Sequence, residues 1–388
     1  MKTGKILSVY LSGYLTGIAL VLYPAAGGLF TDANFHNLSS LQYGTIFIPQ
    51  IVLAIIASLS APRLINRIGI KNVLILGIIS LLLSMSLFAT SHWFYNGQTD
   101  YYFILSGTAF IGAAFGLGIT ALNPLAYSLF PGKETSAVTG MHIMLGLGTA
   151  SSALLLSNFI KLNMWWGAPL MVVLFSLALL LIIFFTSLDS GNIKIEKSEQ
   201  KSKVPAKIWL FAFGVFLYGA CEATFGNFGT VFLQDNKGLN MAMAALGLSL
   251  FWGGITVGRL LFTFIALRFR TDSLLILAPF LVGLIFLLMP ASDGHIGLLA
   301  CMAAGGLGMS FIFPKSISYT TDKFPEHSAL ISGVMVAAIQ LGTGLSSNII
   351  GWLGMTIDMG RLFQFSSIYA FSFGILLLVL IKLKKKND

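Results

Sequence analysis

Long apolar segments constrain this chain more than any other feature, because each is about twenty residues long and matches the hydrocarbon core of a bilayer. Of the 388 residues, 56% are hydrophobic and only 10% are charged, which is more apolar surface than a water-soluble fold of this length can bury. The sequence therefore predicts an all-α membrane protein with twelve transmembrane helices. They are expected at 6–30, 42–62, 72–91, 101–130, 136–160, 165–187, 208–233, 243–267, 273–290, 296–320, 329–354 and 362–381.

The chain divides into two similar halves around a polar stretch at 189–207. Domain limits are predicted at 1–187 and 208–388, with a cytoplasmic linker at 188–207. Gly-Leu-Gly at 116–118 precedes a proline at 124, and Gly-Leu-Gly at 306–308 precedes a proline at 314 at the same distance. Repeated halves of six helices are typical of transporters that expose one site alternately to the two sides of a membrane. We expect two six-helix bundles related by pseudo-twofold symmetry.

The basic residues predict the orientation of the chain. With the N-terminus inside, eighteen of the 23 Lys and Arg fall in cytoplasmic segments, and the external loops hold only Lys161, Lys237 and Arg361. Basic residues accumulate on the cytoplasmic side of membrane proteins. The distribution predicts that both termini are cytoplasmic, and it explains the net charge of +9 without a nucleic acid partner.

One acid stands inside an otherwise apolar span. Glu222 lies near the centre of the segment 209–233. A carboxylate at membrane depth costs roughly 2.5 kcal/mol or more, so it should face protein or water rather than lipid. Either it couples protons to movement of the halves, or it is a static acid that fixes helix packing.

The turn after the second span carries a family signature. Its sequence at 62–71, PRLINRIGIK, resembles the major facilitator signature G-x-L-a-D-R-x-G-R-K at Arg67, Gly69 and Lys71, but has Asn66 in place of the aspartate. The resemblance implies a gating role for these three residues. Arg259, after Gly258 in the second half, is expected to open the related turn that ends at Arg268 and to share the gating role. An ordinary basic loop is the alternative.

Within that superfamily the chain resembles the fucose permease group of sugar:proton symporters. The resemblance rests on LSSLQYG at 38–44, TALNP at 120–124, His142 with the glycines that follow it, and YGACE at 218–222. The group has a glutamate where this chain has Ile119, and a first-span aspartate that has no counterpart here. Proton coupling is therefore expected at Glu222, with His142 as the second titratable candidate; a solvated histidine at a helix end is the alternative.

The resemblance also implies which spans line a central cavity, namely the first, fourth, seventh and tenth. Polar residues there suit a hydroxyl-rich solute, because amides and hydroxyls both donate and accept hydrogen bonds. The predicted substrate-binding residues are Tyr23, Asn123, Tyr127, Tyr218, Glu222, Asn227, Lys315, Tyr319 and, on a flanking helix, Gln340. Lys315 either enters the cavity as an anion anchor or extends its amine to the nearby membrane surface.

These features predict a monomeric secondary active transporter of the bacterial cytoplasmic (inner) membrane that takes up a small polar solute, a sugar or related metabolite, with protons. Two alternatives stay open, namely proton-driven efflux of amphipathic compounds and an organic-anion carrier that uses Lys315. An enzyme is disfavoured because the H-E-x-x-H and G-x-S-x-G motifs are missing from the sequence. Cys221 and Cys301 lack the spacing of a metal site, and no cofactor or metal is expected.

Overall fold

The computed structural model describes residues 2–95, 97–188, 204–268 and 271–381, and these residues form helices without a β-strand. Twelve helical spans are long and apolar enough to cross a membrane, which confirms the predicted number. The first half contains α1 (Lys2–Ala25), α2 (Gly27–Thr31), α3 (Ser40–Thr45), α4 (Phe47–Ile68), α5 (Ile70–Ser91), α6 (Gln98–Leu129), α7 (Glu134–Lys161) and α8 (Gly167–Phe185). The second contains α9 (Ala206–Val231), α10 (Met241–Arg268), α11 (Asp272–Ala291), α12 (His295–Met309), α13 (Ile312–Lys323), α14 (Ser328–Leu353) and α15 (Met359–Ile381). Short helical turns cover His92–Phe94, Phe232–Asn236 and Pro325–His327.

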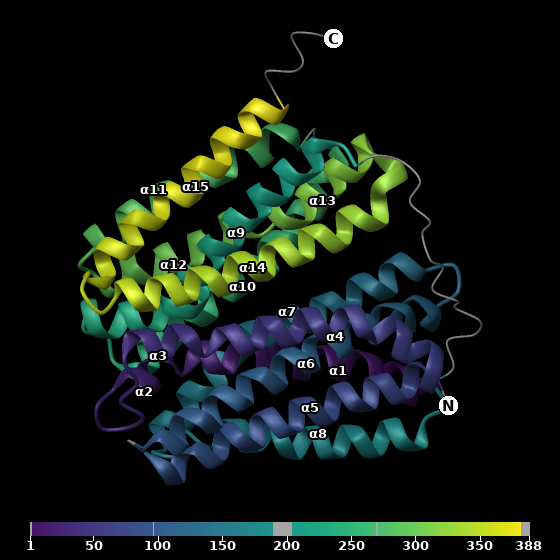
Figure 1. The fold of residues 1–388 in the computed structure, drawn as a ribbon, viewed down its shortest axis with the longest axis horizontal. Coiled ribbons are helices and arrows are strands. Elements are labelled where there is room, and N and C mark those ends of the chain that lie inside the picture. Colours follow the sequence, from purple (N-terminus) through teal and green to yellow (C-terminus); the bar gives the residue numbers. More distant parts are fainter. Residues whose placement is uncertain (1, 96, 189–203, 269–270, 382–388) are drawn as a thin grey trace.

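The helices form two bundles that lie against each other (Figure 1). Helices α1 to α8 make one bundle and α9 to α15 the other, and equivalent helices pack alike in both. Helix α1 packs on α7 as α9 packs on α14, α4 on α6 as α10 on α12, and α5 on α8 as α11 on α15. This correspondence agrees with the repeat that the sequence predicts. Most of the predicted linker, at 189–203, lies outside the described residues.

Three of the twelve spans are interrupted. The first span breaks at Ala26, between α1 and α2, and the second breaks at Ile46, between α3 and α4. The tenth breaks at Ser310 and Phe311, between α12 and α13. Here Pro314 is the cause, since proline has no N–H to donate to the carbonyl four residues earlier and its ring crowds that carbonyl. The carbonyl of Ser310 thereby loses its partner within the helix.

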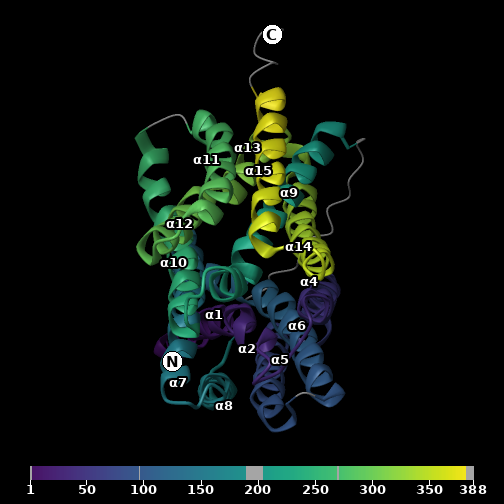
Figure 2. The same cartoon turned by 90° about the vertical axis from the view of Figure 1, so that its left-hand side faces the viewer.

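The bundles meet along two seams. Figure 2 shows α10 above α7 and α14 above α4, and both pairs are in contact. We call the end of the molecule that carries the N-terminus, the end of α8 and the start of α9 the linker end, and the end that carries loop 32–39 the loop end.

The seams are tied together at the loop end. Thr230 of α9 donates to the carbonyl of Pro24 at 2.9 Å, and the Asn348 amide donates to the Thr45 hydroxyl at 3.0 Å. The Tyr43 hydroxyl donates to the carbonyl of Asn227. These hydrogen bonds cross between the bundles and close the loop end.

Two glycines bring the backbones of α3 and α14 together at the same end. A Cβ on Gly351 would lie 2.9 Å from the Cα of Gly44, which is too close for any other residue. Toward the linker end the ribbons of the two bundles diverge (Figure 1). Tyr127, His142 and Arg259 are solvent-exposed there. The structure is therefore closed at the loop end, and these three side chains reach solvent at the linker end.

Candidate functional site

Glu222 and Tyr218 form the centre of a polar cluster on α9. Residues four positions apart share a helix face, so the carboxylate lies beside the phenol. Tyr218 is 1% exposed, and its hydroxyl has no hydrogen bond of normal length to any described residue. Glu222 is half-buried and interacts electrostatically with this hydroxyl and with the guanidinium of Arg259. Glu222 therefore faces protein groups.

Arg259 lies inside α10, nine residues before the helix ends at Arg268. The expectation that it opens a turn is therefore wrong, because α10 continues without a break. Its Nε donates to the carbonyl of Ser310 at 3.1 Å. This is the carbonyl that Pro314 leaves without a helical partner. The broken tenth span thus helps to orient the guanidinium, which interacts electrostatically with Glu222.

The cluster extends across the seam to the first bundle. His142 on α7 interacts electrostatically with Arg259 on α10. Its Nε2 lies 3.1 Å from the Oδ1 of Asn123 on α6. His142 is open to solvent, whereas Asn123 is half-buried. The structure thereby brings together four residues predicted from the sequence, Glu222, Tyr218, His142 and Asn123, with Arg259 between them.

Trp252 is a member of this region that sequence reasoning missed. It lies on α10, four residues before Thr256 and seven residues before Arg259. The Thr256 hydroxyl lies next to Gly146 of α7. Its indole ring lies against Gly226, one turn beyond Glu222, and its Nε1 is buried without a hydrogen-bond partner among the described residues. The substrate-binding residues were sought mainly in the first, fourth, seventh and tenth spans, so Trp252 of the eighth span was passed over.

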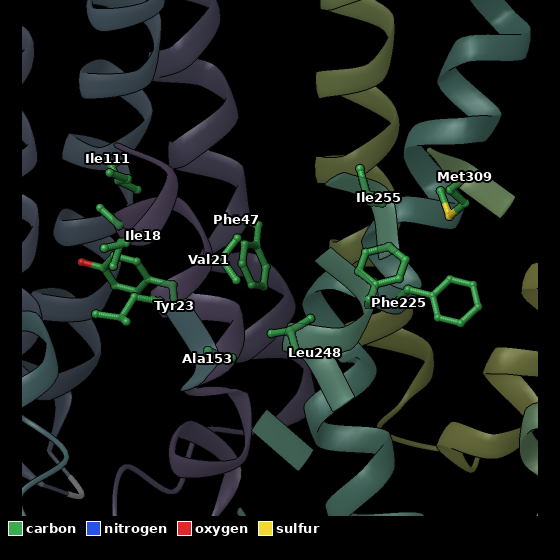
Figure 3. Close-up of a cluster of buried hydrophobic side chains, with 14 of the residues drawn as sticks. Ile18, Val21, Tyr23, Phe47, Ile111, Ala153, Phe225, Leu248, Ile255 and Met309 are labelled. Atoms are coloured by element: carbon green, nitrogen blue, oxygen red, sulfur yellow. The ribbon is translucent and has the colours of Figure 1, made fainter. Parts of the chain in front are cut away.

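Tyr23 points into the first bundle. It is fully buried, and its hydroxyl lies 3.0 Å from the carbonyl and 3.2 Å from the hydroxyl of Ser84 on α5. Figure 3 shows its oxygen directed away from the second bundle, where Phe225 and Leu248 lie. In this conformation Tyr23 is a packing residue, since its only polar atom is already bonded inside the bundle.

Asn227 belongs to the closure at the loop end. Its side-chain amide donates to the Ser347 hydroxyl at 2.8 Å, and its carbonyl accepts from Tyr43. It is 7% exposed. Asn227 would meet a solute only after these bonds open.

Lys315 and Tyr319 lie within the second bundle near the linker end. The Lys315 amine is 3.3 Å from Asp272, the first residue of α11, and 5.9 Å from the centre of the Tyr319 ring. Tyr319 is 8% exposed and packs against Phe211 with ring centres 5.7 Å apart. Lys315 therefore already has an anionic partner in this conformation.

The remaining predicted binding residues occupy different environments. Tyr127, on α6 near the linker end, is 57% exposed. Gln340, on α14, is half-buried. Tyr127 is thus open to the solvent that reaches the linker end.

The signature turn links α4 to α5 at the linker end. Gly69 has φ of +84°, a left-handed conformation that glycine adopts without a steric cost. Lys71 donates to the carbonyl of Phe184 at 2.8 Å, in the last turn of α8. Arg67 is exposed. The turn therefore contacts its own bundle through Lys71.

Among the described residues, no three His, Cys, Asp or Glu side chains gather in a way that could hold a metal ion.

Comparison with known proteins identifies a family and relatives. The sequence profile described as "Major Facilitator Superfamily" matches residues 6–347. The glucose/mannose transporter GlcP of Bacillus subtilis is 21% identical over 88% of this chain and 87% of its own length. A glucose/galactose transporter of Brucella abortus is 26% identical over 87% of this chain and 84% of its own length.

Solved structures share the fold. The nucleoside transporter NupG aligns with a TM-score of 0.78 at 13% identity and covers 98% of this chain and 100% of its own. The Escherichia coli fucose:proton symporter FucP aligns with a TM-score of 0.58 at 18% identity and covers 97% of both chains. At these identities the likeness concerns the fold alone.

Proposed function

Because the chain belongs to the Major Facilitator Superfamily, a family of multi-pass membrane proteins, we propose that it is a secondary transporter that takes up a neutral sugar together with a proton. The observation that carries this proposal is the polar cluster that joins the bundles, with Glu222 and Arg259 on one side and His142 on the other. Two relatives are named glucose transporters, which supports a hexose as the substrate.

We propose that the linker end faces the cytoplasm of a bacterium. The prevalence of Lys and Arg in the segments at that end supports this orientation. The structure then represents the inward-open state of a monomer, with its outer side closed.

In the proposed coupling step, Glu222 takes a proton from external water when the cavity opens outward and releases it to the cytoplasm when the cavity opens inward. The ionised carboxylate neutralises Arg259. Once the carboxyl is protonated, the charge of Arg259 is left uncompensated beside the seam. A change of charge at an interface alters the relative stability of two arrangements of the bundles, which is the requirement for coupling.

The proposed sugar site lies next to this cluster. Trp252 offers an aromatic face and an N–H without a partner among the described residues. The Tyr218 hydroxyl, which interacts with the Glu222 carboxylate, has no hydrogen bond of normal length to them either. Buried polar groups are costly unless they find partners, so hydroxyls of a bound sugar would stabilise both. Asn123, Tyr127 and Gln340 are proposed to add contacts as the bundles move.

The signature turn is proposed to guide the closing of the linker end. Lys71 anchors it to α8, and exposed Arg67 is free to approach the second bundle when the two halves close. Gly69 supplies the bend between α4 and α5.

Uptake into proteoliposomes made with the purified protein tests the proposal. We expect labelled glucose to accumulate above its external concentration when the outside is acidic, and unlabelled glucose, galactose or mannose to compete. Uptake without sensitivity to the proton gradient would contradict coupling. Competition by carboxylates or amphipathic cations but not by hexoses would contradict the sugar.

A further inference from the structure

A pocket lies at the loop end, apart from the polar cluster around Glu222. It has a volume of about 360 Å³, within the range of ligand sites, and is partly open to solvent. Loop 32–39 and the start of α6 form its walls. The residues that line it include His36, Asn37, Gln42, Gln98, Tyr101 and Tyr102.

Backbone hydrogen bonds order the loop wall. The backbone N–H groups of His36 and Leu38 donate to the carbonyls of Leu29 and Phe30, which folds the loop back onto α2. Asn37 has φ of +51°, a conformation that asparagine tolerates better than most residues. A preformed pocket binds a ligand without the entropic cost of ordering a loop.

His36 anchors loop 32–39 to α6 beside the pocket. It is 2% exposed, and its Nδ1 lies 2.8 Å from a carboxylate oxygen of Asp100 in the first turn of α6. Its Nε2 is buried without a partner among the described residues. The imidazole packs against Phe30, Tyr95 and Trp165 and is fully buried, so His36 holds loop 32–39 in place and does not itself contact a ligand.

The lining also defines the class of ligand. It contains amides, phenols and the faces of Tyr101 and Tyr102, but no Asp, Glu, Lys or Arg. Any charge on His36 is balanced by Asp100. Amides pair with hydroxyls in both directions, and aromatic faces pack on the C–H face of a sugar ring. A neutral, hydroxyl-rich solute fits this chemistry better than an anion or a lipid phosphate.

We propose that this pocket is an external binding site for the transported sugar, occupied while the central cavity is closed to the outside. The inference rests on the proposed function for the identity of the sugar and for the external position of the loop end. A sugar bound in this pocket would already be at the loop end when the two bundles separate there.

Thiol labelling tests the site. The variant Gln98→Cys is treated with a membrane-impermeant maleimide in the presence of increasing glucose, alone and combined with Tyr102→Ala or Trp252→Ala. Thr99→Cys is the control, since Thr99 is exposed beside the pocket without lining it. We expect glucose to slow labelling of Gln98→Cys severalfold with the same midpoint in the Trp252→Ala background, and to have no effect with Tyr102→Ala or on Thr99→Cys.

Three results would overturn the inference: unprotected Gln98→Cys, protection that survives Tyr102→Ala, or a midpoint that moves with Trp252→Ala. The last would mean that labelling reports the central site. The uptake assay is read separately, so glucose uptake without protection contradicts the external site alone, and protection without uptake contradicts the proposed function alone.

Discussion

Individual residues in this chain are explained by the partners that their polar atoms find. Glu222 could be identified from the sequence because a carboxylate within an apolar span costs free energy, which indicates a functional role. Arg259 was harder to interpret, since its environment depends on the Ser310 carbonyl 51 residues away. Tyr23, Asn227 and Lys315 were predicted to bind solute, yet each is bonded elsewhere in this conformation, and the sequence contains no signal for the helix face on which a side chain lies.

Replacing Trp252 with Phe tests the proposed sugar site. The change keeps an aromatic ring but removes the N–H, and the loss of one hydrogen bond costs about 0.5–1.5 kcal/mol. We expect the KM for glucose uptake to rise about two- to tenfold while kcat stays the same. Tyr23→Phe is the matched control, and should lower the free energy of unfolding by a similar amount without changing KM. An unchanged KM in Trp252→Phe would remove Trp252 from the site.

Lys315→Ala separates the sugar carrier from the organic-anion alternative. The ion pair with Asp272 is partly exposed, with the Asp272 side chain 37% accessible, so its loss should cost under about 1 kcal/mol of stability. We expect the affinity for glucose to stay unchanged. We also expect that the wild-type protein transports no carboxylate, so that the substitution removes no such activity. A large increase in KM would show that the amine leaves Asp272 and enters the cavity during the cycle.

At the scale of elements, interrupted helices and glycine contacts set how the bundles move. Pro314 was visible in the sequence, and the break that it causes follows from its missing N–H. The closure at the loop end was not visible, because contacts such as Gly44 with Gly351 join segments about 300 residues apart. The role of such a glycine contact can be tested by substituting a bulky residue for the glycine.

Gly351→Val should prevent the closure of α3 against α14. Its Cβ would collide with the carbonyl of Ser40 and the Cα of Gly44, and overpacking of this kind costs about 1–3 kcal/mol. We expect a shift to the outward-open state, seen as faster maleimide labelling of Thr45→Cys from outside and slower uptake. Gly333→Val, on the same helix with open space around Gly333, should change neither. Equal effects of the two substitutions would indicate general destabilisation of α14.

On the scale of the whole molecule, the twelve spans, the repeat and the family could all be predicted from the sequence. Apolar segments of membrane length leave few alternatives to helices, because backbone groups in lipid must bond within their own segment. The conformation could not be predicted, since two arrangements of the same bundles can differ by only a few kcal/mol. At the linker end, His142 and Arg259 are in contact with solvent.

The central claim is that the carboxyl of Glu222 couples the proton to the sugar. The most direct measurement compares glucose accumulation against its gradient with glucose counterflow in proteoliposomes that contain wild-type protein or Glu222→Gln. We predict that Glu222→Gln abolishes accumulation driven by an acidic exterior and retains counterflow, because glutamine preserves hydrogen bonding but carries no titratable proton. Accumulation of glucose by Glu222→Gln at the wild-type level would contradict the account.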